Sequence, residues 1–154
     1  MSVNPIPAGY HSVTPYLIVD GADAAIRFYE KAFGATEVLR MPMGDRIAHA
    51  EIKIGDSHVM LADENPDQGH LGPASRGGAT GSLMIYLPDV DAVFARAVAA
   101  GATAQQSPTD QFWGDRMGSL KDPFGHQWSL ATHTEDVAPE EMERRMAEAF
   151  KQPA

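Results

Sequence analysis

The sequence GATEVLRMPMGDR at residues 34–46 returns as GATAQQSPTDQFWGDR at residues 101–116. Both stretches open with Gly-Ala-Thr and close with Gly-Asp-Arg, and the second is three residues longer. A third match, Gly55 with Gly125, follows in the same order. Matches that recur in order at a nearly constant spacing are typical of a duplicated structural unit. The extra residues predict a small insertion near residues 106–111.

Each copy begins with a segment that predicts a strand followed by a helix. Residues 14–20 and 82–87 are short, apolar and rich in β-branched or aromatic side chains, which favours an extended strand. Residues 22–33 and 90–100 then place apolar side chains at helical spacing. A glycine directly after each helical stretch predicts where that helix ends.

Three more strands are expected after each helix, separated by turns rich in glycine and aspartate. Their predicted bounds are 36–41, 46–54 and 57–62 in the first copy, and 103–107, 116–121 and 126–132 in the second. Each copy therefore has the order βαβββ. The predicted fold class is α+β: two tandem βαβββ modules that form a curled mixed sheet around a cleft, plus a C-terminal helix.

A single domain over residues 1–154 is expected from the length of the chain. Its predicted parts are module one at about 11–64, a linker at 65–80, module two at about 81–135 and a C-terminal helix at about 139–151. The many glycines and prolines of the linker predict an irregular connector. The apolar stripe of the C-terminal helix is expected to pack on the rim of the sheet or on another subunit: Met142, Met146 and Phe150.

Composition and charge disfavour several classes of function. The chain carries 12 Lys and Arg against 21 Asp and Glu, and its formal net charge of −9 disfavours binding to nucleic acid or to anionic membranes. Cysteine is absent, so disulfides, thiolate metal sites and cysteine nucleophiles are excluded. The N-terminal residues lack the pattern of a secretory signal, and no apolar run is long enough to span a bilayer. A cytoplasmic protein is expected.

The duplicated unit and its local motifs resemble the vicinal oxygen chelate superfamily, which includes glyoxalase I, fosfomycin-resistance enzymes, extradiol dioxygenases and bleomycin-binding proteins. The resemblance spans about residues 11–150. Within the superfamily, the local motifs are similar to those of the PhnB-like branch. The resemblance is carried by TPYL at 14–17, FYEKAFG at 28–34, HAEI at 49–52, FWGDR at 112–116 and DPFGHQW at 122–128. The resemblance implies a cleft that holds a small molecule.

Metalloenzymes of this superfamily carry a ligand, usually His, Gln or Glu, on the first and last strand of each module. The resemblance places these positions on side chains of another kind: Thr14, Ser82, Ser129 and Val59, with Met60 or Leu61 in place of Val59 if the register differs. Hydroxyl and aliphatic groups are poor ligands for a divalent transition metal, which prefers imidazole or carboxylate. We therefore expect no metal at these positions and no cofactor.

His49 and Glu51 are the first candidates for catalysis. They lie two residues apart on an expected strand, so both side chains leave the face opposite its apolar residues. They fit either displaced metal ligands or an acid–base pair, because histidine titrates near neutrality. The alternative is a solvated strand face with one His–Glu hydrogen bond. His126, after a turn glycine, is either a cap of that turn or a third functional candidate.

Phe112 and Trp113, next to Arg116, are the strongest local signal for a ligand site. The two aromatic side chains fit a wall over a planar apolar ligand, and Arg116 fits an anionic group. The alternative is that the aromatic pair fills a module or subunit interface while Arg116 is solvated. Tyr16 on the first strand and Ser129 on the last complete the predicted ligand-binding set.

Three functions follow from these observations. The first is a binding or sequestering protein without a metal, expected to be a homodimer, that takes a small aromatic or anionic molecule into its cleft. The second is a lyase, isomerase or group-transfer enzyme of the same superfamily that uses relocated metal ligands or acid–base residues. The third is a structural or regulatory dimer whose cleft is filled by its own side chains.

Overall fold

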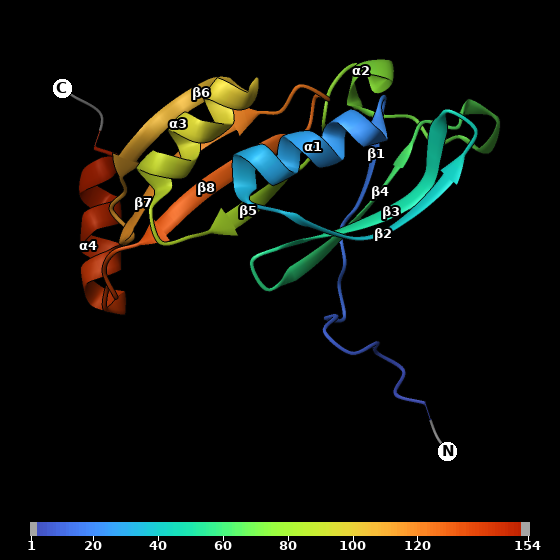
Figure 1. Ribbon diagram of the computed structural model, residues 1–154. Helices are drawn as coiled ribbons and strands as arrows, with labels where there is room; N and C mark the ends of the chain where they lie inside the picture. Colours follow the sequence, from blue (N-terminus) through green and yellow to red (C-terminus); the bar gives the residue numbers. More distant parts are fainter. Residues whose placement is uncertain (1–2, 152–154) are drawn as a thin grey trace.

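Two four-stranded mixed sheets form the body of the protein in the computed structural model, which describes residues 3–151 (Figure 1). The first has the order β1-β4-β3-β2, with the bounds β1 Tyr16–Val19, β2 Thr36–Met43, β3 Arg46–Ile54 and β4 Ser57–Asp63. The second has the order β5-β8-β7-β6, with the bounds β5 Ser82–Tyr86, β6 Thr103–Asp110, β7 Asp115–Lys121 and β8 Gln127–His133. In each module the first and last strands pair in parallel and the other neighbours are antiparallel. The predicted α+β class with two βαβββ modules is confirmed.

The described part of the chain leaves out both ends of the expected domain. Residues 1–2, which belong to the N-terminal stretch considered for a secretory signal, and residues 152–154 lie outside it. Within residues 3–151, no helix is long and apolar enough to cross a membrane.

One helix lies against each sheet, and both match the predicted bounds: α1 spans Ala22–Phe33 and α3 spans Val90–Ala100. Gly34 ends α1 with φ 69°, a left-handed conformation that favours glycine. The side chain of Asp89 accepts a hydrogen bond from the N–H of Ala92 and caps α3. The two helices contact each other on the same side of the sheets (Figure 1).

The two sheets stay separate, so the expected cleft does not arise from one continuous curled sheet. Within residues 3–151, no strand ladder joins the two sheets. The helix α1 connects the modules instead, because Tyr29 and Phe33 pack against Trp128 of β8 with ring centroids 5.4 and 5.0 Å apart. The hydrophobic core is therefore continuous across both modules although the sheet is not.

Most strand bounds differ from the prediction by one to three residues, and two of these differences have a clear physical reason. The strand β1 begins at Tyr16 rather than at residue 14, after a proline that has no N–H to donate. The strand β6 extends to Asp110, because the three inserted residues are absorbed as shifts of register against β7.

The linker was expected to be an irregular connector, but part of it is helical. It contains a 3-10 helix η1, Pro66–Gln68, and a short helix α2, Pro73–Arg76, each of which begins with proline. Its remaining residues form turns and an isolated bridge between Asn65 and His70.

Each sheet has one face covered by α1 and α3 and one face without a helix, here called the open face. In β1, Leu17 and Val19 are buried beneath the helices, whereas Tyr16 lies on the open face. In β8, Trp128 is buried toward the helices. Ser129, predicted to bind a ligand, lies on the open face and lines neither of the two clefts described below.

The C-terminal helix α4 spans Pro139–Ala149 and lies at the end of the second sheet (Figure 1). None of its residues is buried, so its apolar stripe packs only in part. Phe150, just after the helix, meets Phe112 edge-on with centroids 6.3 Å apart. Arg145 fixes the helix through an ion pair with Glu135 at 2.8 Å.

Candidate functional site

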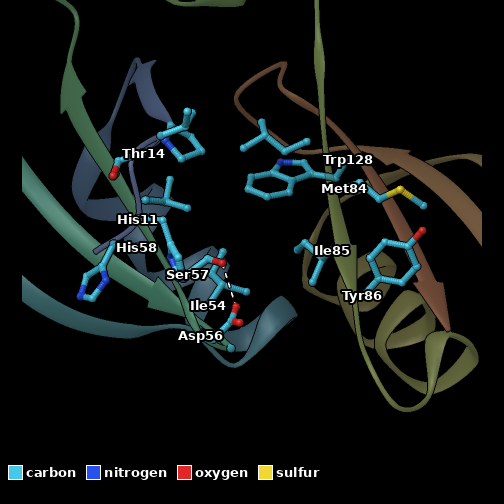
Figure 2. A pocket seen from close by; sticks show the side chains of 15 residues that line it. His11, Thr14, Ile54, Asp56, Ser57, His58, Met84, Ile85, Tyr86 and Trp128 are labelled. Atoms are coloured by element: carbon cyan, nitrogen blue, oxygen red, sulfur yellow. Dashed lines mark hydrogen bonds between the residues drawn. The ribbon is translucent and has the colours of Figure 1, made fainter. Parts of the chain in front are cut away.

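A cleft of about 720 Å³ opens between the two modules (Figure 2). One wall comes from module one, from residues 11–15 before β1 and residues 54–59 around the β3–β4 turn. The other wall comes from residues 83–86 of β5, and Trp128 of β8 reaches between the two walls (Figure 2). A concave site of this size with many apolar side chains is typical of pockets that bind small organic molecules.

Trp128 is held in place by Asp122, a carboxylate in the β7–β8 turn that is only 3% exposed. The Trp128 indole and the Tyr29 hydroxyl donate to Oδ2 of Asp122 at 2.9 and 2.6 Å. The backbone N–H groups of Phe124 and His126 each donate to Oδ1 at 2.9 Å. Four donors fill both oxygens, which is the arrangement of an ionised carboxylate, and all four are neutral groups.

A second buried carboxylate, Asp115, lies behind Tyr86 and is also 3% exposed. It accepts hydrogen bonds from the Tyr86 hydroxyl at 2.9 Å and from the Trp113 indole at 3.1 Å. Burial acts to raise the pKa of Asp115, but hydrogen bonds from His133, Tyr86 and Trp113 lower it below its ordinary value. The hydrogen bond to Asp115 raises the pKa of Tyr86, so the phenol keeps its proton.

His133 lies between Asp115 and Asp136, with Nδ1 and Nε2 at 2.8 and 2.9 Å from one oxygen of each. The hydrogen bonds to these two carboxylates raise the pKa of His133 above its ordinary value. Its side chain is half-exposed, but its first partner is one of the two buried carboxylates.

His49 and Glu51 share the open face of the first sheet and are joined by the hydrogen bond predicted for them, at 3.1 Å. The pair is extended at both ends, since the Tyr16 hydroxyl lies 2.7 Å from His49 Nδ1 and the Tyr10 hydroxyl donates to Glu51. Burial raises the pKa of Tyr16, so its hydroxyl keeps its proton and is able to donate to His49. Tyr10 also stacks on His58 with ring centroids 3.9 Å apart. This Tyr–His–Glu–Tyr chain is suited to acid–base chemistry, but it does not line the cleft of Figure 2.

His126 is not part of the Tyr–His–Glu–Tyr hydrogen-bond chain. Its backbone N–H caps Asp122, and its Nε2 lies 2.9 Å from the carbonyl oxygen of Ile18, to which it donates. His126 therefore ties the β7–β8 turn of module two to β1 of module one, which favours the structural interpretation.

Phe112, Trp113 and Arg116 do not line the cleft. Phe112 and Trp113 pack edge-on against each other at 5.0 Å between centroids, in the β6–β7 turn beside α4. Arg116 follows Asp115 on β7 and so points to the opposite face, where its guanidinium forms ion pairs with Asp91 at 2.6 Å and with Asp110 at 3.2 Å. The structure separates Arg116 from the aromatic pair that it was expected to assist.

The four positions expected to hold a metal in related enzymes do not meet. Thr14 lies on the wall of the cleft, and Ser82 lines a second, smaller cleft. On β4 the pairing with β1 puts Met60, rather than Val59, on the open face. Within residues 3–151, no group of three or more His, Asp or Glu side chains is arranged to hold a metal ion. This donor set does not fit a divalent metal, so no step through one is derived.

The second cleft, of about 430 Å³, is the module-two counterpart of the first. It is lined by β1, by the start of β5 and by His126 of the β7–β8 turn. The linker adds residues 71–73, 76 and 78–80 to its lining, and this cleft is smaller and more polar than the first. Tyr16, predicted to bind a ligand, lies on its rim.

Sequence reasoning missed the residues that shape the larger cleft. Asp122 belongs to a DPFG segment that was interpreted as a turn, and a turn aspartate gives no sign that it will be buried. Met84, Tyr86 and Asp56 lie on an edge strand and a hairpin turn, and only the placement of the two modules brings these elements together.

Comparisons with known proteins agree with this architecture. The family model of the Glyoxalase/Bleomycin resistance protein/Dioxygenase superfamily matches residues 9–130. A protein of Mycobacterium bovis named "Uncharacterized protein Mb0911c" is 41% identical over 151 residues, which cover 96% of this chain and 97% of that protein.

Two solved structures share the fold. The crystal structure of TioX from Micromonospora sp. ML1 has a TM-score of 0.64 and 26% identity, and the match covers 83% of this chain and 100% of that one. The PhnB protein from Bacillus cereus has a TM-score of 0.62 and 18% identity, and the match covers 79% of this chain and 99% of that one.

Proposed function

This chain belongs to the glyoxalase/bleomycin resistance/dioxygenase superfamily, and from that premise we propose that it binds a small, mainly apolar molecule in the cleft between its modules, without a metal. The observation that carries this proposal is the cleft itself, with its wall of β5 and its buried tryptophan (Figure 2). Thr14 occupies a position where metalloenzymes of the superfamily carry a metal ligand. A hydroxyl group there is a poor metal ligand, which supports binding that needs no metal ion. The motifs FWGDR and DPFGHQW favour the PhnB-like branch, and a cytoplasmic location is the accompanying proposal.

The test uses a neutral fluorescent probe, N-phenyl-1-naphthylamine, and a substitution that fills the cleft. Met84 is 44% exposed on the β5 wall, and Met84→Trp would add a large ring there. We expect the Met84→Trp protein to bind the probe at least about tenfold more weakly than the wild type, because the added ring occupies volume that a ligand needs.

Met43→Trp is the matched control. Met43 is 57% exposed on β2, away from the cleft, so the same substitution there should leave the affinity within about twofold. Treatment with a chelator should not change probe binding to the wild type. Equal affinities in the two tryptophan variants, or loss of binding with the chelator, would contradict the proposal.

A second function, acid–base catalysis at Tyr16, His49 and Glu51, is favoured by one observation, their continuous hydrogen-bond chain. When His49 Nε2 donates to Glu51, Nδ1 can accept a hydrogen bond from the Tyr16 hydroxyl. If this chain is catalytic, turnover of any substrate found for the protein should fall at least about a hundredfold in His49→Gln, with little change in stability.

A further inference from the structure

The strand β5 has a free edge, and that edge lines the larger cleft. It pairs with another strand on one side only, with β8, and the N–H of Leu87 donates to the carbonyl oxygen of Ala131 in β8 at 2.9 Å. In a parallel ladder, residues that bond to the neighbouring strand alternate with residues whose N–H and C=O both point away from it. Because Leu87 bonds to β8, the backbone groups of Tyr86 and Met84 point away from β8. Both residues line the cleft.

In the other half of the molecule, the corresponding edge is closed by a histidine. The strand β1 follows the same alternation, and the backbone of Ile18 points away from β4. Its carbonyl oxygen accepts a hydrogen bond from His126 Nε2, at 2.9 Å, across the contact between the modules. Tyr86 is the module-two counterpart of Ile18, because each lies opposite an alanine on the last strand of its module, Ala131 and Ala62 respectively.

The residue in the place of His126 does not close the edge at Tyr86. The same correspondence between β4 and β8 puts Ser57 at that position. Its side chain is much shorter than that of histidine, and its hydroxyl donates to Asp56 at 2.8 Å (Figure 2). Within residues 3–151, no hydrogen bond from outside the second sheet reaches the backbone of Tyr86. The larger cleft opens at this point, with Asp56 and Ser57 on one wall and Tyr86 on the other.

A ligand in this cleft therefore meets one backbone N–H and one C=O on the same side of Tyr86. Backbone polar groups that lose water must be given other hydrogen-bond partners. A residue of an extended peptide presents its own N–H and C=O on one side, and two such residues exchange two hydrogen bonds in an antiparallel pair. Added strands of this kind obtain affinity from the main chain and specificity from side-chain pockets.

We infer that the ligand is an acylated amino acid amide, whose N–H and C=O exchange hydrogen bonds with the backbone of Tyr86 and whose apolar side chain lies in the cleft. This inference rests on the proposed function and names the chemical class of its ligand. Of the residues that the structure describes, no lysine or arginine lines the cleft, and Asp56 lies on the opposite wall. A neutral amide at the carboxyl end is therefore favoured over a free carboxylate.

Two probes that differ in a single group test the inference. N-acetyl-phenylalanine methylamide has the N–H and the C=O on one side, and the methylamide of O-acetyl-phenyllactic acid has an ester oxygen in place of that N–H. The affinity of each is measured by displacement of N-phenyl-1-naphthylamine from the protein. We expect the amide to bind at least about tenfold more tightly, because the ester loses one hydrogen bond and sets its oxygen against the Tyr86 carbonyl.

Hydrogen exchange of the backbone amides, followed by NMR, locates the contact. In the free protein, the N–H groups of Met84 and Tyr86 should exchange faster than those of Ile85 and Leu87, which bond to β8. Saturation with N-acetyl-phenylalanine methylamide should slow the exchange of the Tyr86 amide at least about fivefold. The amide of Gly44, in the distant β2–β3 turn, is the internal reference and should not change.

Ser57→His supplies the histidine that module one lacks. An imidazole that donates to the Tyr86 carbonyl competes with the N–H of the amide probe, so the preference for amide over ester should fall to within about twofold. A ratio of affinities is used because the larger side chain also takes volume from both probes. Ser57→Ala is the matched control, since it adds no donor and should keep the preference of the wild type.

The outcomes separate the inference from the proposed function. If the naphthylamine binds in the cleft, as judged by Met84→Trp, but the amide and the ester displace it equally or not at all, the inference is wrong and the proposed function stands. The same holds if the amide probe displaces the naphthylamine and leaves the exchange of Tyr86 unchanged. If the naphthylamine does not bind in the cleft, the proposed function fails, and the inference fails with it.

Discussion

Asp122 links the core to the cleft, because its carboxylate holds both Tyr29 of α1 and Trp128 of β8. The hydrogen bonds to this residue come from two modules, so its side chain fixes how they meet. Burying a charge is costly unless every oxygen is satisfied, and the four donors meet that condition. The position of Trp128 is therefore set by Asp122, a residue that does not itself line the cleft.

The first prediction concerns that carboxylate. Asp122→Asn replaces an acceptor oxygen by an NH₂ group that faces two donors, and we expect the free energy of unfolding to fall by about 2 kcal/mol. Urea denaturation measures it. Asp45→Asn, in the exposed β2–β3 turn, is the control and should change it by less than about 0.5 kcal/mol. Equal effects of the two substitutions would show that Asp122 does not carry this role.

The second prediction concerns the pH dependence of His133, whose pKa is raised by Asp115 and Asp136. A histidine with a raised pKa stabilises the folded state when protonated, and this contribution is lost as the pH rises through the folded pKa. An NMR titration should give His133 a pKa above that of an unstructured histidine. Asp136→Asn should lower it, and an unchanged pKa in that variant would contradict the assignment.

At the scale of single residues, the His49–Glu51 hydrogen bond could be predicted from the sequence. Residues that are two positions apart on a strand have side chains on the same face. The same rule explains why the Arg116 side chain does not lie beside Phe112 and Trp113. Asp115 already belongs to β7, so Arg116 alternates to the face opposite Asp115. A shift of one residue in a strand changes the face of every side chain, and the sequence does not define strand ends that closely.

Strands and helices were predictable where a local signal marks their ends. The helices α1 and α3 both end at glycine and have the predicted bounds. The helix α4 is followed by Phe150 instead of a glycine, and it ends two residues before the predicted bound. The extension of β6 was not predicted, because the position of an insertion within a strand depends on how the neighbouring strand pairs with it. The short helices of the linker lie in a glycine- and proline-rich segment whose composition favours a connector.

The third prediction concerns the two Gly-Asp-Arg turns, which are alike in sequence but differ in surroundings. Gly114 has φ 97°, and a Cβ there would clash with the backbone carbonyl of Glu135. Gly44 has φ 65° and open space around it. We expect Gly114→Ala to destabilise the protein by about 3 kcal/mol or more, and Gly44→Ala by about 1 kcal/mol from backbone strain alone. Thermal unfolding of both variants tests this, and similar melting temperatures would contradict it.

At the scale of the whole molecule, the duplication of the βαβββ unit explains why the contact between the modules has two related clefts. The linker explains why the two clefts differ. The first cleft is open, whereas the linker adds its own residues to the second. The motifs allowed the superfamily and a cleft to be predicted. The walls of the cleft could not be predicted, because β5 and the β3–β4 turn meet only through the packing of α1 on module two.

The fourth prediction is the homodimer expected from the resemblance. Large apolar side chains are exposed on the open face of the first sheet, among them Met41 and Tyr16, and a second copy would cover them. Sedimentation equilibrium should give twice the chain mass of 16.6 kDa. Met41→Glu should shift the protein toward the monomer, whereas Val98→Glu on α3 should not. A monomeric wild type at micromolar concentration would contradict the expectation.

The most direct measurement is a crystal structure of the protein with bound N-phenyl-1-naphthylamine. The account predicts the probe between β5 and residues 11–15, with no metal in contact with it. Density for the probe only on the open face near His49, or a metal ion beside Thr14 that contacts the probe, would contradict it.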